Sequence, residues 1–558
     1  MDDIEFFFPF SWDHVYDDFN RWDETWTTGF DHYEFLWELN QTVPMDGVLI
    51  SRNVIGESAN RKEKMEEAGG VKNFLRIPED VILFGDCGAF NYKDEPEPPY
   101  DPIETLDFYE RMQFDRACTV DHLIAGSDHK RDRWELTLSN AEKMIEAYQR
   151  GDYSFELYGV VQGWNPDSYH ASARRLVEMG FENLALGGLV GTRTREIISI
   201  LQRCYPAWMD RDVNVHEFGI ARWELFPFMQ RYGVNSFDNT YHQKAWRDRK
   251  NNYELSPRNK YTAVRVPISD QYSDERLPEE QAVFDEFKAY VKGEATPEEV
   301  VETLQEYEEV YAELKNKESR IEIFEDLKDE YLETLRYRPW EDCDCHICDE
   351  YGVHVCIFRR NERNMRRGFH NLYRFYHAFR GFLNDEVDPP TKLRRYSEPE
   401  QINDLDVDEF DGDVLMISSC SKTKKDTAEG AEVPAEELYQ GRLMKRVRTL
   451  CEATGWDHRI ISAKHGLLSP TDEIAAYKET LSKNEGALRL RPKVIPELAA
   501  IMQEYDQILV VAGEQYRKVI EPMYDDRFHI LNSAGYPVLC SKIKEATPSL
   551  TTEISQYE

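Results

Sequence analysis

Short apolar runs that alternate with amphipathic stretches constrain the fold of this chain more than any other feature. Four runs have the length and the flanking polar or glycine residues of buried parallel strands, at 47–50, 81–84, 156–161 and 183–186. Segments with helical periodicity lie between them, as at 141–150 and 166–179. The repetition of strand and helix predicts a parallel α/β domain, in which functional residues follow the carboxyl ends of the strands.

The rest of the chain divides by composition. We expect the first α/β domain to fill residues 1–270. Residues 271–340 carry 21 acidic and 9 basic residues with a long helical period, which predicts a solvated helical insertion rather than a partner-binding arm. A cysteine cluster and an arginine-rich stretch occupy 341–384, and residues 385–412 have the composition of a linker. A second α/β domain is expected over 413–558.

The net charge bears on the class of partner. The 558 residues include 106 Asp and Glu against 68 Lys and Arg, which leaves a net charge of −38. Such an excess repels phosphates and argues against a nucleic-acid substrate. A salt-rich cytoplasm is the other origin of such charge, because salt screens the repulsion between surface carboxylates. We favour this halophilic interpretation.

Hydrophobic residues make up 41% of the chain, which excludes general disorder. No run approaches the ~18 apolar residues of a membrane span. The acidic first residues do not match a secretory signal. We therefore expect a cytoplasmic protein without a membrane partner.

Three cysteines fall within six residues, at Cys343, Cys345 and Cys348. With His370 downstream they form the donor set of a tetrahedral Cys₃His zinc site, which is structural because four protein ligands leave no position for water. His346, His354 and His377 are alternatives for the fourth ligand. A catalytic metal is the weaker interpretation.

Polar residues or glycines follow several of the strand-like runs. The set comprises Asp86, Asp121, Gln162 and Gly163, the run Gly187, Gly188 and Leu189, and finally Asp238. Taken singly, an aspartate after a strand is usually a helix cap, and a glycine pair is usually a tight turn. Their shared place after strands is what indicates one site.

In this order, and together with the cysteine cluster and 370–372, these motifs resemble those of the tRNA-guanine transglycosylases. The resemblance covers roughly residues 46–383. It implies a TIM-like (β/α)₈ barrel with a zinc-binding subdomain, which exchanges a guanine base in a polynucleotide for a 7-deazaguanine. The family's usual D-S-G-G-F-Q reads D-C-G-A-F-N at 86–91, so the polar contacts of Cys87 and Asn91 are expected to differ.

The resemblance also implies the roles of the residues. Asp238 is the nucleophile that forms a covalent glycosyl-enzyme, and Asp86 is the general acid/base, the pair that a retaining exchange at C1′ requires. Asp121, Gln162 and Gly163 are expected to bind the base, with the backbone amides of 187–189 near its O6. The target nucleotide has to be unstacked to reach them.

The segments 415–424, 438–439 and 461–470 resemble, at a distance, the YaaA family of DNA-associated stress proteins. Behind a divergent transglycosylase, this arrangement resembles the Dpd-type DNA transglycosylases. That resemblance implies insertion of 7-cyano-7-deazaguanine (preQ0) into DNA, within a modification and restriction system that includes ATPase or nuclease proteins. A tRNA-guanine transglycosylase and a catalytically silent nucleic-acid-binding paralogue remain alternatives.

The lysines of 415–424 are compatible with phosphate binding and, equally, with a solvated loop. A second active site at Cys420 and His465 is a weaker alternative.

Positive charge is concentrated at 356–380, with seven arginines against Glu362 and interleaved aromatic residues. This predicts a surface that follows a nucleic-acid backbone, with a helix that merely has a basic solvent face as the alternative. The predicted contact residues are Arg359, Arg360, Arg363, Arg366 and Arg367, joined by Arg247 and Arg249 after the presumed nucleophile.

Overall fold

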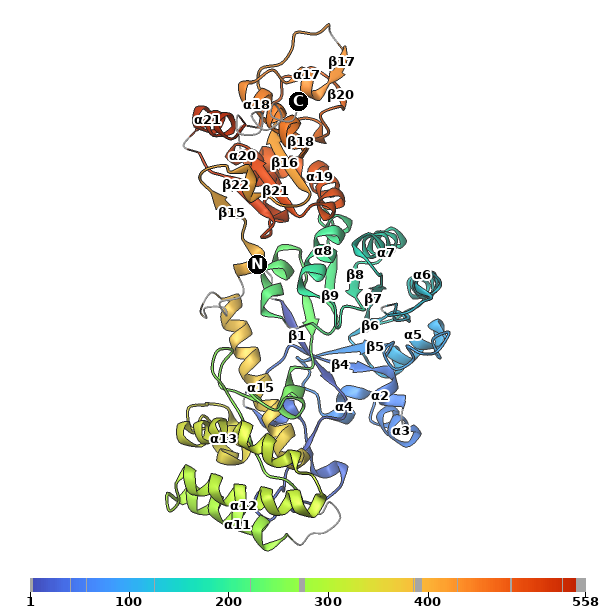
Figure 1. Cartoon of the computed structure of the whole chain (residues 1–558). Coiled ribbons are helices and arrows are strands. Elements are labelled where there is room, and N and C mark those ends of the chain that lie inside the picture. Colours follow the sequence, from blue (N-terminus) through green and yellow to red (C-terminus); the bar gives the residue numbers. More distant parts are fainter. Residues whose placement is uncertain are drawn as a thin grey trace.

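Eight parallel strands close into a barrel at the centre of the molecule (Figure 1). The computed structural model describes residues 4–547 apart from 41, 57, 125, 221, 270–275, 385, 387–393, 429, 482–483 and 534. The barrel strands are β1 (Glu5–Phe10), β4 (Gly47–Ser51), β5 (Ile82–Asp86), β6 (Arg116–Cys118), β7 (Glu156–Val161), β8 (Asn183–Leu186), β9 (Asn214–Glu217) and β10 (Ser236–Asp238). The predicted (β/α)₈ barrel is confirmed.

Helices cover the outside of the barrel. They are α2 (Arg52–Gly56), α3 (Ala59–Glu67), α4 (Val71–Leu75), α5 (Pro102–Arg111), α6 (Lys130–Arg150), α7 (Pro166–Met179), α8 (Thr194–Cys204), α9 (Phe226–Arg231) and α10 (Lys244–Arg247). A long excursion after β1 holds β2 (Val15–Tyr16), β3 (Tyr33–Glu34) and α1 (Leu36–Leu39). Among the described residues, no helix is both long and apolar enough to span a bilayer.

Side chains fill the barrel, so it is a packed core. Phe7, Leu49, Phe84 and Tyr158 pack with one another inside it, whereas the residues between them in each strand face the helices. Gly47 is required where β4 passes β1, because a Cβ there would lie 2.2 Å from the ring of Phe7. Because the interior is filled, we expect a functional site at the ends of the strands.

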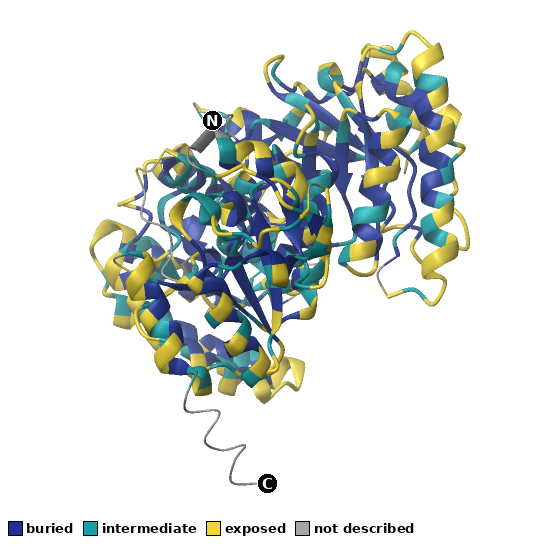
Figure 2. Cartoon of the chain, turned by 90° about the horizontal axis from the view of Figure 1, so that it is seen from above, coloured by how far each residue is buried: buried dark blue, intermediate teal, exposed yellow. Residues whose placement is uncertain are grey.

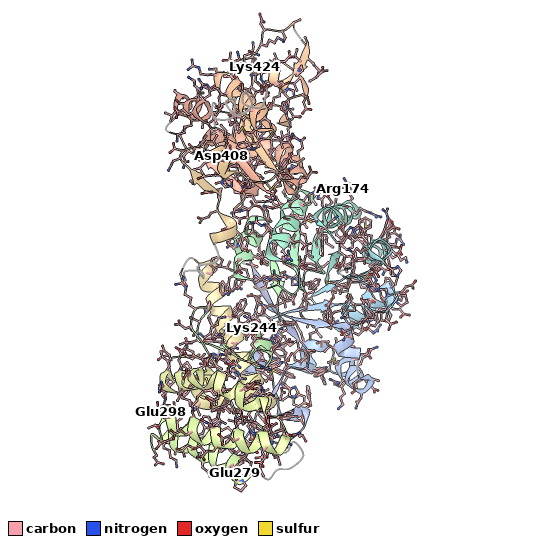
Figure 3. The ribbon with its side chains drawn as sticks, in the orientation of Figure 1. Arg174, Lys244, Glu279, Glu298, Asp408 and Lys424 are labelled. Atoms are coloured by element: carbon pink, nitrogen blue, oxygen red, sulfur yellow. The ribbon has the colours of Figure 1, made fainter. Side chains whose placement is uncertain are left out.

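Three helices form the acidic segment, α11 (Pro278–Lys292), α12 (Pro297–Lys315) and α13 (Ser319–Tyr337). They pack side by side at the end of the molecule where Figure 3 labels Glu279 and Glu298. Each helix buries an apolar stripe, as at Phe284, Leu304 and Leu327, and exposes its carboxylates. Figure 2 shows the same alternation of buried and exposed faces on the helices.

Small elements connect this bundle to the barrel. They are β11 (Tyr253–Glu254), β12 (Lys260–Tyr261), β13 (Val264–Arg265), α14 (His346–Tyr351) and β14 (Ile357–Phe358). They lead into the long helix α15 (Arg360–Leu383), which packs on α10 and on the barrel residues Phe6 and Phe237.

The C-terminal part is an open sheet of six strands in the order β15-β22-β21-β16-β18-β19. The strands are β15 (Glu400–Ile402), β16 (Val414–Ser419), β18 (Asp457–Ser462), β19 (Gly466–Leu468), β21 (Gln507–Val511) and β22 (Phe528–Leu531). The helices α18 (Arg442–Thr454) and α21 (Tyr536–Ala546) cover one face, and α19 (Asn484–Ile501) and α20 (Glu514–Ile520) cover the other. A separate two-stranded antiparallel sheet of β17 (Glu432–Pro434) and β20 (Glu473–Ala475) lies beside α17 (Ala435–Leu438).

The stretch 385–412, predicted as a linker, contains structure of its own. The helix α16 (Arg394–Ser397) lies in it, and β15 is an edge strand that pairs with β22. The linker prediction is therefore wrong for residues 400–402, because backbone pairing places them in the C-terminal sheet.

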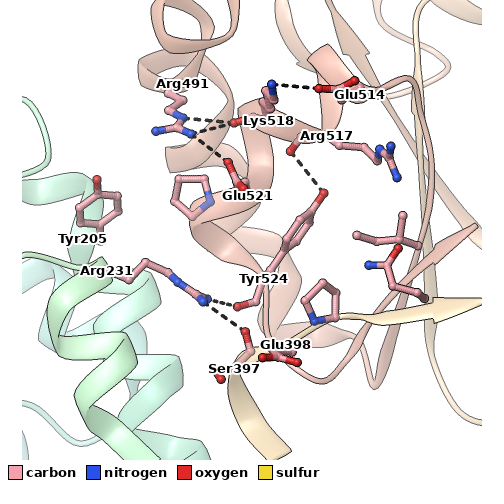
Figure 4. Close-up of a pocket in the computed structure, with 14 residues that line it drawn as sticks. Tyr205, Arg231, Ser397, Glu398, Arg491, Glu514, Arg517, Lys518, Glu521 and Tyr524 are labelled. Atoms are coloured by element: carbon pink, nitrogen blue, oxygen red, sulfur yellow. Dashed lines mark hydrogen bonds and ion pairs between the residues drawn. The ribbon is translucent and has the colours of Figure 1, made fainter. Parts of the chain in front are cut away.

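The C-terminal domain contacts α8 of the barrel through buried polar groups. Gln202 donates to Asp525 at 3.0 Å, and both residues are fully buried. Beside this contact lies a 680 Å³ cavity (Figure 4), lined by Tyr205 and Arg231 of the barrel and otherwise by residues of the C-terminal part. Arg231 donates there to the carbonyl oxygens of Tyr524 and Ser397.

Candidate active site

The carboxyl ends of the barrel strands bring the predicted residues to one mouth. Asp86 ends β5 and Asp238 ends β10, while Gln162 directly follows β7 and Asp121 lies three residues beyond β6. All neighbouring strands in the barrel are parallel, so these ends share one side. The structure thus brings together, from four separate strands, residues for which the sequence showed only their order along the chain.

Asp238 is buried and Asp86 is half-buried, and the two carboxylates lie close enough for their charges to interact. Ser51 donates its hydroxyl to Asp86 Oδ2 at 2.7 Å. Burial raises the pKa of Asp86, the Ser51 bond opposes the rise, and the charge of Asp238 adds to it. A carboxyl whose pKa is raised in this way holds a proton more readily than an exposed carboxyl does, as a general acid must.

Asp238 is fixed by the strand beside it. The amide of Gly219 donates to Asp238 Oδ1 at 2.9 Å, and His216 Nε2 lies 3.4 Å from the same oxygen. His216 is in turn held by Ser236 Oγ at 2.8 Å from its Nδ1. Both contacts of Asp238 are to Oδ1, and no group among the described residues donates to Oδ2, so one oxygen of Asp238 is left for a reacting atom.

Asp121 lies at the centre of a buried network. Cys87 donates its thiol to Oδ1 at 2.8 Å, and Gln162 donates its amide to Oδ2 at 2.7 Å. Tyr92 donates to the backbone oxygen of Asp121 at 2.9 Å. Burial raises the pKa of Asp121 to about 6, with these hydrogen bonds opposing the rise and the Asp86 charge adding to it. Cys87 therefore makes a polar contact with Asp121, whereas the side chain of Asn91 is exposed.

The glycine run after β8 is close to Gln162. A Cβ on Gly187 or Gly188 would lie 2.6 or 2.7 Å from the amide of Gln162, and Gly188 has a φ of +74°. Both positions therefore require glycine. Gln162 Oε1 is buried, and no protein group among the described residues donates to it, so it remains available to a ligand.

One expected contact of this run is wrong. The amide of Gly187 donates to the carbonyl oxygen of Val161 at 3.0 Å, because it continues the pairing of β7 with β8. It therefore has no hydrogen left for a base. Among the described residues, no group accepts a hydrogen bond from the amides of Gly188 and Leu189. Gly163 lies against Tyr169 in the preceding loop, between β7 and α7.

Three residues that position the carboxylates were missed from the sequence, namely Ser51, His216 and Gly219. Ser51 ends β4 and Gly219 lies just beyond β9, as the predicted residues do at their strands, whereas His216 is one residue before the end of β9. The same signal could have found the first two. Glu217 was missed as well. It is fully buried, and both of its carboxylate oxygens lack a partner among the described atoms. Burial raises the pKa of Glu217 to about 8, the Arg222 charge opposes the rise and the Asp238 charge adds to it.

The predicted metal ligands do come together. The Sγ atoms of Cys343, Cys345 and Cys348 lie 3.5, 3.3 and 3.3 Å from His370 Nδ1. A tetrahedral zinc ion holds sulfur and nitrogen ligands about 3.5 Å apart, so the four buried donors fit it without rearrangement. They could hold a metal ion.

The other histidines considered for this site lie elsewhere. His346 is 3.6 Å from Glu350, His354 packs on Trp22, and His377 lies against Tyr373. His370 is therefore the fourth donor of the cluster.

The predicted basic surface at 359–367 is not a surface. Arg359, Arg363, Arg366 and Arg367 are at most 3% exposed. Arg359 and Arg363 bind Glu24, from the excursion after β1, while Arg366 binds Glu362 at 2.5 Å. Arg367 donates to backbone carbonyl oxygens such as that of Ala245. The prediction is wrong for these four because their charges are already used inside the protein.

Arg360 is half-buried and binds Glu24 as well. Arg247 and Arg249 are exposed, and Arg247 lies 3.7 Å from the carboxylate of Asp248. Of the seven predicted contact residues, these two are the ones open to a nucleic acid.

Comparison with known proteins agrees with this geometry. Residues 45–251 match the family described as queuine tRNA-ribosyltransferase, and residues 414–533 match a family of unknown function (DUF6884). A DNA-guanine transglycosylase of Salmonella montevideo is 33% identical over 374 residues, which are 61% of this chain and 88% of that protein.

More distant relatives cover less. A queuine tRNA-ribosyltransferase of Chromohalobacter salexigens is 34% identical over 106 residues, 19% of this chain and 28% of its own. One of Protochlamydia amoebophila is 24% identical over 183 residues, 31% of this chain and 44% of its own.

Proposed function

The chain belongs to the guanine transglycosylase family, and from that premise we propose that it exchanges guanine for preQ0 in DNA through a covalent intermediate on Asp238. The paired carboxylates Asp86 and Asp238 carry the proposal for the chemistry. The extent of the similarity to a DNA-guanine transglycosylase supports DNA over tRNA as the substrate.

The proposed reaction has two displacements at C1′. Asp238 Oδ2 attacks C1′ while protonated Asp86 gives its proton to the departing guanine, so the C–N bond breaks as the C–O bond forms. Asp86 then takes a proton from the incoming base, whose nitrogen displaces Asp238. Two inversions retain the configuration. The contacts of Gly219 and His216 hold Asp238 in place for both steps.

The base pocket is proposed to read guanine by its hydrogen-bonding edge. Asp121 can accept from the amino and imino N–H groups, because each of its oxygens has a lone pair left beside the bonds to Cys87 and Gln162. The free amides of Gly188 and Leu189 are proposed to donate to O6. Phe90, four residues after Asp86, is 64% exposed and offers a ring for stacking.

Zinc is proposed for the Cys₃His cluster in a structural role. Cys343, Cys345, Cys348 and His370 would use all four positions of the ion, which leaves none for water or substrate. Bound there, zinc would fix α14 to α15 and so support the side of the barrel that carries β10.

A groove beside β1 is proposed to hold a nucleotide next to the target, in place of the buried arginines. Its volume is 620 Å³, and its lining includes Trp12, His14, Tyr33, Phe74, Arg61 and Lys64. Phe10 of β1 pairs with Ile50 of β4, and the next residue of β4, Ser51, pairs with Asp86 of β5. Ser11, which follows Phe10, is therefore level with Asp86 and lies two strands away from it, at about 10 Å. The aromatic rings can stack on bases and the cations can bind phosphates, and this combination fits single-stranded DNA.

Backbone strain at the groove supports this use. Trp12 has a φ of 64°, which is rare for a bulky residue. Its ring N–H donates to the Val54 oxygen at 3.1 Å, and the Arg61 guanidinium lies 4.1 Å from the ring centroid. Strain of this kind persists where the surroundings fix it and tends to mark functional sites.

The acidic composition is proposed to reflect a saline cytoplasm. The acid is densest on the insertion helices α11 to α13, at the end of the molecule where Figure 3 labels Glu279 and Glu298. Phosphate attraction is weakened in such a medium, so DNA affinity would depend on stacking and on the base pocket.

Incorporation of labelled preQ0 tests the substrate. The full chain is incubated with guanine-containing DNA and, separately, with tRNA, in each case with and without candidate ATPase or nuclease partners. We expect label in DNA. Label in tRNA alone would overturn the DNA assignment and favour the tRNA enzyme. Absence of label in both would favour a silent nucleic-acid-binding paralogue.

A further inference from the structure

The C-terminal sheet has a point at which the order of its strands reverses. From β16 the chain continues to β18 on one side, whereas from β21 it continues to β22 on the other side, and β16 and β21 are neighbours. In open α/β sheets, ligands bind outside the carboxyl ends of the strands at such a point. A 550 Å³ cavity lies there, lined by residues that end or follow β16, β21 and β22.

The cavity is cationic in a strongly acidic chain. Lys422, Lys424 and Arg517 line it, against Glu479 and Glu514. Glu514 is already bound to Lys518 at 3.0 Å, which leaves the cations in excess. Because the rest of the protein repels anions, a local excess of positive charge indicates an anionic ligand.

Lys424 is held in a partly desolvated position. Its Nζ lies 4.2 Å from the ring centroid of Tyr477, and burial lowers its pKa, with Cys420 and Glu479 opposing. An ammonium group that has lost part of its water gains more from a bound anion than a fully hydrated one does. Figure 3 shows Lys424 in the C-terminal domain, at the far end from Glu279 and Glu298.

The other walls of the cavity are apolar or hydroxylated. The apolar wall consists of Leu443, Leu481, Leu531, Leu539, Tyr516 and Tyr536, and hydroxyl groups come from Ser419, Ser421 and Thr480. A flat ring suits the first wall, and a sugar or phosphate suits the second. The volume lies within the range of ligand sites, about 300–1,000 Å³.

A buried hydroxyl network supports the lysine side of the cavity. Tyr477 OH lies 2.8 Å from Tyr439 OH and 2.9 Å from Ser462 Oγ. Cys420 Sγ lies 3.2 Å from Tyr516 OH at the other side. The tyrosine contacts join two of the segments that the sequence singled out, 438–439 and 461–470, and Cys420 belongs to the third, 415–424. They hold the cavity wall in one arrangement before any ligand binds.

We propose that this cavity binds a nucleoside 5′-monophosphate group, with the phosphate on Lys422 and Lys424 and the base on the leucine and tyrosine wall. The group comes either as a free nucleotide or as the phosphorylated end of a polynucleotide. The proposal does not depend on the function proposed for the barrel.

Titration calorimetry on the full chain tests it, with adenosine 5′-monophosphate as the probe. We expect saturable binding of one nucleotide per chain, and weaker binding of adenosine alone and of inorganic phosphate alone. Lys422→Ala and Lys424→Ala should each weaken binding about tenfold or more, because each removes a charge-assisted hydrogen bond. Lys422 is exposed, so its removal leaves the fold intact.

Lys425→Ala is the matched control, since Lys425 lies in the same loop but binds Glu437 at 2.9 Å. It should leave binding unchanged, as should Asp121→Ala in the barrel. A 5′-phosphorylated oligonucleotide that displaces the probe, where its 5′-hydroxyl form does not, would identify the polynucleotide end as the source. Absence of binding by every probe, or equal loss in Lys425→Ala, would overturn the proposal.

Discussion

Two buried clusters of charged residues in this protein are built in opposite ways. Around Glu24, the charges are matched: Arg359, Arg360 and Arg363 bind its carboxylate, and Arg276 lies 3.4 Å from it. At the barrel mouth, no lysine or arginine of the described part of the chain binds the carboxylates of Asp86, Asp121, Asp238 or Glu217. A matched cluster, in which acids are paired with arginines, holds parts of the chain together. An unmatched cluster, of acids without such partners, can hold protons and bind a ligand.

The pKa values show the same contrast. Burial would raise the pKa of Glu24, but Arg363 and Arg359 lower it to about 2. Burial raises the pKa of Asp86, Asp121 and Glu217, and no arginine outweighs it. Acids with a raised pKa in a cleft are typical of functional sites, whereas acids paired with arginines are typical of structural contacts.

The largest effect is expected at the unmatched cluster. Asp238→Asn should lower the rate of base exchange by at least about 10³-fold, because the amide cannot form the glycosyl ester. Stability should be unchanged or slightly higher, since a buried negative charge is lost. Asp248→Asn, at a half-exposed position ten residues further along the chain, is the control. Exchange at the normal rate in Asp238→Asn, measured by labelled base incorporation, would remove Asp238 from the mechanism.

At the matched cluster the effect falls on folding. Glu24→Gln leaves several buried guanidinium groups without a carboxylate, and we expect a loss of about 3–5 kcal/mol in the free energy of unfolding. Because Glu24 has a lowered pKa when folded, its contribution should be present above about pH 4.5 and vanish as pH falls toward 2. Denaturant unfolding measures both effects. A matching loss in Asp23→Asn, at an exposed position, would contradict them.

Glu217 should show the opposite dependence on pH. Its pKa is about 8 in the folded protein against an ordinary value of 4.5, so between these pH values the folded state holds a proton that the unfolded state has lost. Stability should therefore fall as pH rises from 5 to 8. Glu217→Gln should remove that fall, gaining about 2–4 kcal/mol over the parent at pH 8 and little at pH 5.

Unfolding curves at the two pH values measure this difference, with the exposed Glu196→Gln as control. A gain for Glu217→Gln that is the same at both pH values would mean that Glu217 does not change its protonation in this range.

The smallest effect is expected at the exposed cations. Arg247→Ala and Arg249→Ala together should weaken DNA binding a few-fold in low salt, and less in high salt, because they neutralise phosphates at the surface. Stability should change by less than about 0.5 kcal/mol. A binding assay at two salt concentrations checks this. A large loss of stability would place these arginines with the buried ones.

Much of the fold follows from the sequence because buried parallel strands are continuous apolar runs. The expected strands at 156–161 and 183–186 coincide with β7 and β8. The first strand, Glu5–Phe10, was not recognised, since Pro9 interrupts a run that lies within an acidic start. An edge strand such as β15 is short and polar, so its composition resembles that of a linker.

The site was predictable for a related reason. Residues that end parallel strands meet at one mouth, so Asp86, Asp121, Gln162 and Asp238 could be grouped from their positions. The arginines of α15 could not be judged in this way. Glu24 is more than 330 residues away in sequence from Arg359, and composition counts charges without their partners.

Trapping of a covalent complex with DNA tests the central claim most directly. The full chain is incubated with guanine-containing single-stranded DNA without an incoming base, denatured, and separated on a gel. The parent protein should form an adduct that survives denaturation and disappears on addition of preQ0, and Asp238→Asn should form none. An adduct that persists in Asp238→Asn, or that forms with tRNA and not with DNA, would contradict the account.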